Sequence, residues 1–346
     1  MSWTDSFPIF DDDMMHRYHQ EVHEESKRLL TSFFEIEATI NPQDRASHVV
    51  ATSLFWKRDA SLQKELPPIT RELMMKARSL GLAGRFDPWD HYVLPILDGA
   101  RILAKDHLDC VFRIYLANDL SFLVEDLAGA GCEVAVMRSS SIRHNPGAMW
   151  RFLAMGERER LVTIIDADRG RDIASNVRRT QTAHLARLSG WRVPYNFGEE
   201  DLDSPHEGYR PINASQFGST CAYPMRDLLE SFVWHSLEKT LPARCNRGDG
   251  KDYPISCTTW PNYGFDEWFL LSAIYPRMAK GGLLTFRPWD KVLQNPFFSI
   301  DVEYATWASP NSELIYYHTI EAPTNPATAS GASSDADAWG SLIPQA

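Results

Sequence analysis

Several common features are missing from this chain of 346 residues, and each absence disfavours a class of protein. The five cysteines are widely spaced and include no Cys-x-x-Cys pair, which disfavours a disulfide framework and a structural zinc site. No apolar run approaches the roughly 18 residues of a membrane-spanning helix. The acidic N-terminus lacks the apolar core of a signal peptide. We therefore expect a soluble, cytoplasmic protein without a transmembrane segment.

The chain also contains fewer positively charged than negatively charged residues. The 35 Lys and Arg residues are outnumbered by 46 Asp and Glu, for a net charge of -11, which disfavours a nucleic-acid partner. The sequence has no phosphate-binding GKS or GKT loop, no Gly-x-Ser-x-Gly and no His-Glu-x-x-His. A small phosphate-bearing ligand remains compatible with an acidic protein, because a divalent cation can bridge carboxylates to phosphates.

Short apolar runs alternate with helix-like segments through the first half of the chain. This alternation predicts an α/β fold with a mostly parallel sheet flanked by helices. Ligands of such sheets bind beyond the carboxyl ends of the strands. The expected strands are residues 49–56, 110–117, 132–138 and 161–166, and the expected helices are 92–107, 121–131, 147–157, 172–188, 222–241 and 263–280.

The two ends of the chain differ from this pattern. Residues 14–38 lack Pro and Gly and predict one amphipathic helix, whose apolar stripe is a candidate docking or dimerisation face; the stripe consists of Leu29, Leu30, Phe33 and Phe34. Residues 321–346 contain no Lys or Arg and predict a disordered tail. We expect a helical extension over 1–47 and one catalytic domain over 48–320, with a nucleotide half (48–170) and an acceptor half (171–320).

The strongest candidate for chemistry is the pair Asp166 and Asp168, at the end of the predicted strand 161–166. Two carboxylates one residue apart at a strand end suit Mg²⁺ or Mn²⁺, which bind oxygen ligands and add phosphate oxygens. The tripeptide alone is unspecific, because Asp-Ala-Asp also occurs at 335–337. A solvated strand end with an Asp-capped turn is the alternative.

An ordered set of motifs extends this pair into a family resemblance. The segments Gly147–Ala154 (GAMWRFLA), Ile165–Arg169 (IDADR) and Phe265–Leu270 (FDEWFL) occur in this order, and Tyr275-Pro276 follows. Earlier matches are Ser53–Phe55, Asp98–Ala100 and Phe112–Leu116. The set resembles the GT-A-fold, DxD-type glycosyltransferases that use nucleotide-activated sugars, in particular a bacterial and viral group.

The resemblance implies a role for the residues around the donor. Asp166 and Asp168 would hold Mn²⁺ or Mg²⁺ and contact the diphosphate or ribose of a UDP- or GDP-sugar. Arg151 would point toward the diphosphate or the DxD strand, with a structural arginine as the alternative. Ser53 and Leu54 would line the nucleotide pocket, with plain core positions as the alternative.

Two acidic residues belong to the acceptor side. The resemblance places Asp266, followed by Glu267, near the sugar and the acceptor, as a base or as a hydrogen-bond partner of sugar hydroxyls. A helix N-cap is the alternative for Asp266. A histidine that often completes the metal site in the group is missing from residues 283–287, so the third metal ligand stays open. Arg169 or Arg171 is an alternative partner of the diphosphate.

The sequence therefore predicts a glycosyltransferase that moves a sugar from a nucleotide-sugar donor to the hydroxyl of an unidentified acceptor. Inversion and retention of the anomeric centre both stay open. Two other hypotheses remain: a degenerate GT-A domain that binds a glycan or a protein, and, more weakly, a nucleotidyltransferase.

Overall fold

The computed structural model describes most of the N-terminal half of the chain and parts of the C-terminal half. The described residues are 10–56, 68–83, 85–106, 109–139, 146–157, 160–178, 189–192, 214, 216–219, 223–237, 245–246, 252–253, 266, 269–274 and 284–287. Glu267, the second Asp-Ala-Asp and the predicted tail over 321–346 lie outside these residues.

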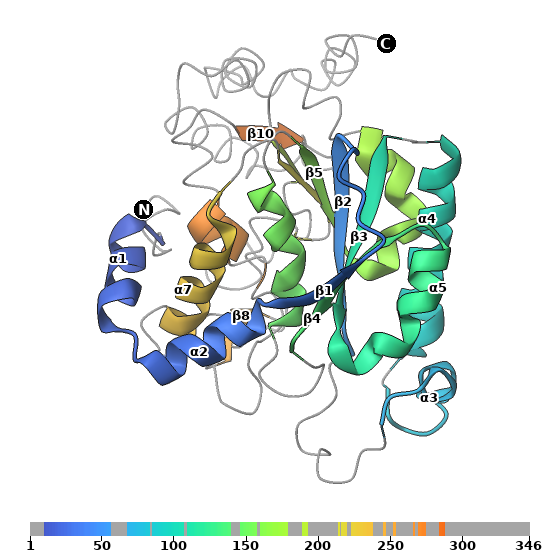
Figure 1. Ribbon diagram of the computed structural model, residues 1–346, viewed down its shortest axis with the longest axis horizontal. Helices are drawn as coiled ribbons and strands as arrows, with labels where there is room; N and C mark the ends of the chain where they lie inside the picture. Colours follow the sequence, from blue (N-terminus) through green and yellow to red (C-terminus); the bar gives the residue numbers. More distant parts are fainter. Residues whose placement is uncertain are drawn as a thin grey trace, which may run out of the picture.

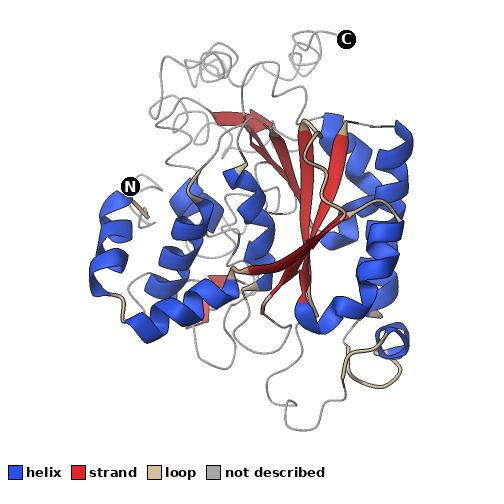
Figure 2. Ribbon diagram, in the orientation of Figure 1, coloured by secondary structure: helices blue, strands red, loops and turns tan. Residues whose placement is uncertain are grey.

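A mostly parallel sheet forms the centre of the described structure (Figures 1 and 2). Its strand order is β1-β4-β3-β2-β5-β7, with β2, β3, β4 and β5 mutually parallel and β1 and β7 antiparallel to their neighbours. The strands are β1 (Ile36–Ile40), β2 (His48–Leu54), β3 (Cys110–Ala117), β4 (Glu133–Met137), β5 (Leu161–Ile165) and β7 (Gln216–Ser219). This arrangement is Rossmann-like and confirms the predicted α/β class.

Helices cover both faces of the sheet, with α4 and α5 on one side and η5 and α7 on the other (Figure 1). The helical elements are α1 (Asp12–Glu21), α2 (Glu24–Phe33), α3 (Arg71–Lys76), the π-helical turn η3 (Trp89–Val93), α4 (Leu94–Asp106), the 3-10 helix η4 (Asn118–Leu123), α5 (Val124–Gly129), the 3-10 helices η5 (Gly147–Gly156) and η6 (Ala167–Asp172), α7 (Met225–Leu237) and the π-helical turn η8 (Leu270–Ile274). Residues 173–178 are also helical. Two further strand pairs are β6 (Ser189–Arg192) with β10 (Leu284–Arg287) and β8 (Cys245–Asn246) with β9 (Asp252–Tyr253).

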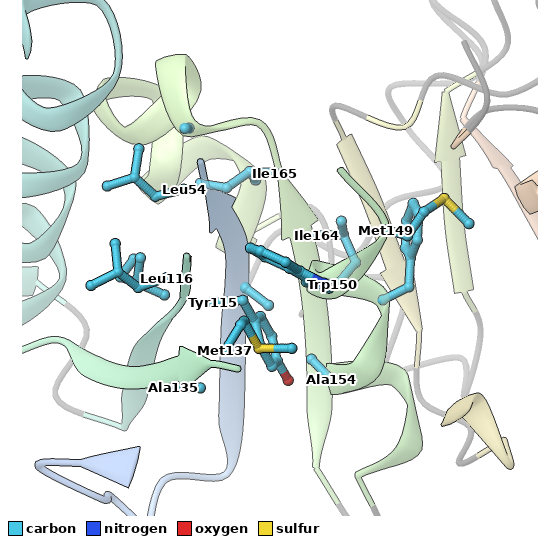
Figure 3. Close-up of a cluster of buried hydrophobic side chains, with 14 of the residues drawn as sticks. Leu54, Tyr115, Leu116, Ala135, Met137, Met149, Trp150, Ala154, Ile164 and Ile165 are labelled. Carbon is cyan, nitrogen blue, oxygen red and sulfur yellow. The ribbon is translucent and has the colours of Figure 1, made fainter. Parts of the chain in front are cut away.

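The parallel strands are apolar on both faces because both faces are covered. In Figure 3, Leu54 and Leu116 point to one side of the sheet, while Tyr115 and Met137 lie on the side of Trp150. All five of these side chains are buried. The largely apolar runs that predicted these strands, which include Arg113 in β3 and Glu133 in β4, follow from this two-sided burial.

The strand order reverses between β2 and β5. Along the chain β2 is followed by β3 and β4 on one side of it, whereas β5 pairs on the other side, with Ala51 opposite Ile164. Such a switch point leaves room for a ligand beyond the carboxyl ends of the two strands. Ser53, near the end of β2, and Asp166, just after β5, therefore lie at the same edge of the sheet.

The single helix predicted over residues 14–38 is wrong. Two helices occupy this stretch, because Val22 leaves the helical conformation at φ -66° and ψ 126°. The segment from Ile36 to Ile40 is the strand β1, which pairs antiparallel with β4. Three of its five residues, Ile36, Thr39 and Ile40, are β-branched, which suits a strand, and pairing with β4 outweighs the helical context that precedes it.

The apolar stripe of this segment is part of the protein core. Leu30, Phe33 and Phe34 are buried, and only Leu29 of the four is exposed, at 52%. The Tyr18 hydroxyl donates to Glu230 of α7 at 3.0 Å, and the Trp150 indole N–H donates to the Phe33 carbonyl at 2.7 Å. The stripe therefore packs inside this chain, which contradicts its assignment as a docking or dimerisation face.

None of the described helices is long and apolar enough to cross a membrane. The predicted division into 1–47, 48–320 and 321–346 stays a prediction, although β1 joins residues of the first range to the main sheet.

Candidate functional site

The Asp166-Ala167-Asp168 tripeptide lies where the sequence predicted it, directly after a buried strand. Every residue of β5 is buried, and Asp166 continues the extended backbone before η6 begins at Ala167. The Arg169 N–H donates to the Asp166 carbonyl at 3.0 Å and closes the turn. The side chains of Asp166 and Asp168 are 41% and 33% exposed, so both carboxylates reach the surface at the edge of the sheet.

Two glycines allow the turn after this tripeptide to pack directly on α4. A Cβ atom on Gly170 would lie 1.9 Å from the Pro95 carbonyl oxygen, and one on Gly99 would lie 2.7 Å from the Gly170 carbonyl oxygen. Neither position has space for a larger residue. The close contact of η6 with α4 fixes the position of Asp168 relative to the start of α4.

Arg151 of η5 connects three segments of the site. Its side chain is only 5% exposed, and its Nη1 donates to Asp166 and, at 3.3 Å, to the Ile165 carbonyl. Its Nη2 donates to Asp266 Oδ2 at 2.5 Å. One buried guanidinium therefore contacts the first aspartate of the tripeptide and the candidate acceptor-side aspartate together.

The environment of Arg151 keeps it charged. Burial alone lowers the pKa of the guanidinium, but the carboxylates of Asp166 and Asp266 outweigh this effect and raise the pKa above its ordinary value. The two carboxylates share this one cation, since the described residues show both within hydrogen-bonding distance of Arg151.

The structure gives Ser53 and Leu54 different surroundings. The Ser53 hydroxyl accepts a hydrogen bond from the Arg151 backbone N–H at 2.9 Å and so joins β2 to η5. Leu54 is 2% exposed and packs in the core on the side of Leu116. Ser53 is thus adjacent to the site through Arg151, whereas Leu54 offers no surface to a ligand.

In the described residues, Asp168 has no arginine ion pair like the one that Asp166 makes with Arg151. Burial and the neighbouring Asp166 carboxylate raise its pKa, and Arg169 and His91 offset part of this rise. Its Oδ1 atom is buried without a hydrogen-bond partner among the described residues. Its Oδ2 atom lies 3.8 Å from His91 Nε2.

His91 is a site residue that the sequence did not suggest. Its ring stacks on Phe86 with centroids 4.2 Å apart and meets Tyr92 edge-on at 4.6 Å. Burial and the carboxylates of Asp168 and Asp166 raise the pKa of the Tyr92 hydroxyl, which places this aromatic group in the field of the tripeptide. No motif contains His91, and its approach to Asp168 depends on the packing of α4 against η6.

Each of the two arginines after the tripeptide pairs with a carboxylate outside it, and the partner of Arg171 is shared with Arg101. Arg171 Nε donates to Asp98 at 2.9 Å, and Arg169 Nη1 lies 3.5 Å from Asp172. In the described residues, the guanidinium of Arg151 pairs with the carboxylates of Asp166 and Asp266, and the carboxylate of Asp168 follows two residues after Asp166. This excess of negative charge favours a bound cation over an anion that binds alone.

A metal ion at this position fits Asp168 better than Asp166. The Oδ1 atom of Asp168 has no hydrogen-bond partner among the described residues, whereas Asp166 Oδ1 is already held by Arg151. In the described part of the chain, no three His, Cys, Asp or Glu side chains are arranged to hold a metal ion by themselves. Any cation here needs ligands from a substrate or from water as well.

Comparisons of this chain with protein-family models, curated proteins and solved structures gave no match. The motif resemblance and the geometry of the site are therefore the basis for a functional proposal.

Proposed function

We propose that this chain is a GT-A-type glycosyltransferase that transfers a sugar from a UDP- or GDP-sugar to an acceptor hydroxyl. The observation that carries the proposal is the meeting of Asp166, Asp168, Arg151 and Asp266 at the carboxyl edge of β5, beside the switch point between β2 and β5. The first three residues come from adjacent elements, and Asp266 lies about a hundred positions later in the chain.

The proposal assigns each residue a task that its surroundings permit. The nucleotide binds beyond the ends of β2 and β5, and Asp168 faces its diphosphate through Mn²⁺ or Mg²⁺. When bound, such a cation stabilises negative charge on a departing diphosphate. Arg151 fixes the orientation of Asp166 and Asp266 by hydrogen bonds to both.

The acceptor hydroxyl is assigned to Asp266. The hydrogen bond from the buried Arg151 guanidinium fixes the position of the Asp266 carboxylate. In the proposal, this carboxylate is the hydrogen-bond partner of the acceptor hydroxyl or of a sugar hydroxyl. Glu267, the next residue, is the alternative base.

A nucleotide-sugar assay with site variants tests the proposal. We expect the wild-type protein to be thermally stabilised by UDP or GDP with Mn²⁺ and to hydrolyse or transfer from one nucleotide-sugar in a panel. Asp166→Ala and Asp168→Ala should lose this turnover, while Asp172→Ala, at an exposed carboxylate close by, should keep it.

The outcomes separate the competing functions. Unchanged turnover in both Asp166→Ala and Asp168→Ala would contradict the metal-site assignment. Absence of any thermal shift with nucleotides would favour a binding module for a glycan or a protein. Release of pyrophosphate would favour a nucleotidyltransferase.

A further inference from the structure

We infer that His91 is a protein ligand of the divalent cation at the end of β5, together with Asp168. The inference rests on the proposed function, because it concerns the cation that would accompany the donor diphosphate. It assigns the site a nitrogen ligand from the turn before α4, a segment that none of the sequence motifs includes.

The distance between the two side chains suits a shared cation. Two ligand atoms bound at about 2.1 Å to one octahedral ion lie about 3.0 Å apart at neighbouring positions and about 4.2 Å apart at opposite positions. His91 Nε2 and Asp168 Oδ2 are 3.8 Å apart, between these two values and beyond ordinary hydrogen-bonding distance, so an approach of about 0.8 Å would bring them to neighbouring positions of one ion. One ion between them needs only small side-chain adjustments.

The imidazole of His91 is held in place before any ligand arrives. Phe86 stacks on one face of the ring at an interplanar angle of 17°, and Tyr92 contacts it edge-on. Its backbone N–H donates to the Asp87 carbonyl at 3.1 Å, and η3 leads directly into α4, which is packed on η6 through Gly99 and Gly170. A ligand fixed in this way loses little conformational entropy when it binds a metal.

The charges around His91 favour a cation over a direct contact with phosphate. Asp168 faces it through Oδ2 and has a second oxygen, Oδ1, that is buried without a hydrogen-bond partner among the described residues, while the guanidinium of Arg151 is shared by Asp166 and Asp266. Arg169 pairs with Asp172, and Arg171 pairs with Asp98, which also pairs with Arg101. A diphosphate therefore meets net negative charge in the described residues unless a cation accompanies it.

Two protein ligands are enough for a cation that a nucleotide substrate accompanies. With one oxygen of Asp166 held by Arg151, Asp168 and His91 supply one oxygen and one nitrogen, and phosphate oxygens and water complete the coordination. Free metal then binds weakly and the metal–nucleotide complex binds well. A nitrogen ligand further favours Mn²⁺, Co²⁺ or Zn²⁺ over Mg²⁺, which prefers oxygen ligands.

Pulsed EPR of bound Mn²⁺ tests the inference without an activity assay. The full chain is mixed with Mn²⁺ and UDP, and separately with Mn²⁺ and GDP, and the spin echo is examined for modulation by a directly bound imidazole nitrogen. Labelling the histidines with ¹⁵N should change the modulation. This measurement on the wild-type protein does not depend on the folding of any variant.

Variants identify the histidine. His91→Phe keeps a flat ring against Phe86 and Tyr92 but removes the nitrogen, so the modulation should vanish and the affinity for Mn²⁺ in the presence of nucleotide should fall at least about tenfold. His23→Phe is the matched control, because His23 is exposed and its side chain makes no capping hydrogen bond at the start of α2. The control should retain both the modulation and the affinity.

The inference and the proposed function can fail separately. Nitrogen modulation that is absent from the wild type, or that persists in His91→Phe, overturns the role of His91 even if sugar transfer is found. Modulation that depends on His91 supports the inference even if every nucleotide-sugar assay is negative, in which case the transferase proposal fails.

Discussion

The guanidinium of Arg151 and the carboxylate of Asp266 are joined by a hydrogen bond of 2.5 Å between Nη2 and Oδ2, although 115 residues separate them in the chain. The same buried guanidinium contacts Asp166 after β5. One cation thus fixes two carboxylates from distant segments, and the geometry of the site depends on its charge.

Replacement of Arg151 should destabilise the fold strongly. Arg151→Met leaves two carboxylates without their shared cation, and breaking a buried ion pair costs about 3 to 5 kcal/mol. Urea unfolding measures the loss, and Arg151→Met/Asp166→Asn should lose less because one of the unpaired charges is gone. Arg17→Met, which breaks an exposed pair with Glu21, should lose less than about 1 kcal/mol. Equal losses in Arg151→Met and Arg17→Met would show that the Arg151 bridge is energetically minor.

Gly170 should not tolerate a side chain. The Cβ of Gly170→Ala would lie 1.9 Å from the Pro95 carbonyl oxygen, so α4 and η6 must separate, at a cost of about 1 to 3 kcal/mol or more. Gly129→Ala is the control, because nothing lies within 4 Å of the new methyl group and the residue is at the end of helix α5. Thermal unfolding compares the two, and the prediction is wrong if both variants melt at the wild-type temperature.

The stability of the protein should depend on pH through Asp168. Its pKa is raised in the folded chain above the ordinary value of 3.8, so the folded form binds the proton more tightly than the unfolded form. The resulting stabilisation is present below pH 3.8 and is lost as the pH rises through the higher folded pKa. Asp168→Asn carries no charge at any pH, so it should raise the melting temperature at pH 7 and have little effect at pH 3.

An exposed neighbour provides the comparison for this pH effect. Asp172→Asn changes a carboxylate that is 56% exposed, and its melting temperature should follow the wild type at both pH values. A lower melting temperature of Asp168→Asn at pH 7 would mean that the Asp168 carboxylate is stabilising in the folded protein, contrary to the direction derived from its burial.

The contact between the N-terminal helices and α7 should contribute measurably to stability. The buried Tyr18 hydroxyl donates to Glu230, and Tyr18→Phe removes a hydrogen bond to a charged group, which is worth about 1.5 to 3 kcal/mol. Tyr92→Phe removes a hydroxyl from a partly exposed ring and should change the free energy of unfolding by less than about 0.5 kcal/mol. Chemical denaturation distinguishes the two, and equal effects would contradict the importance of this contact.

Alkaline pH tests the same contact in the wild type. Burial, followed by the charge of Glu230, raises the pKa of Tyr18 well above its ordinary value of 10.0. The stability linked to the protonated hydroxyl is complete below pH 10 and is lost as the pH rises toward the folded pKa. We expect wild-type stability to fall more steeply than that of Tyr18→Phe above pH 10, measured by urea unfolding at a series of pH values.

The sequence by itself determined the parallel strands and the position of the first two site residues. Strands β2, β3, β4 and β5 are buried on both faces, so their apolar, β-branched character is local and visible in the sequence. Asp166 and Asp168 follow the last of these strands, and a strand end has to present polar groups at the edge of the sheet. The residues within each strand and directly after it were sufficient to predict both the parallel strands and the two aspartates at the end of β5.

Only the tertiary structure decided which side chains meet. Residues 36–40 become β1 because β4 offers an edge for pairing, which outweighs the helical pattern before them. Arg151 reaches Asp266, and His91 reaches Asp168, because η5 packs beside β2 and α4 packs on η6 through two glycines. Such contacts depend on distances between segments that lie far apart in the chain, and no local pattern of residues records those distances.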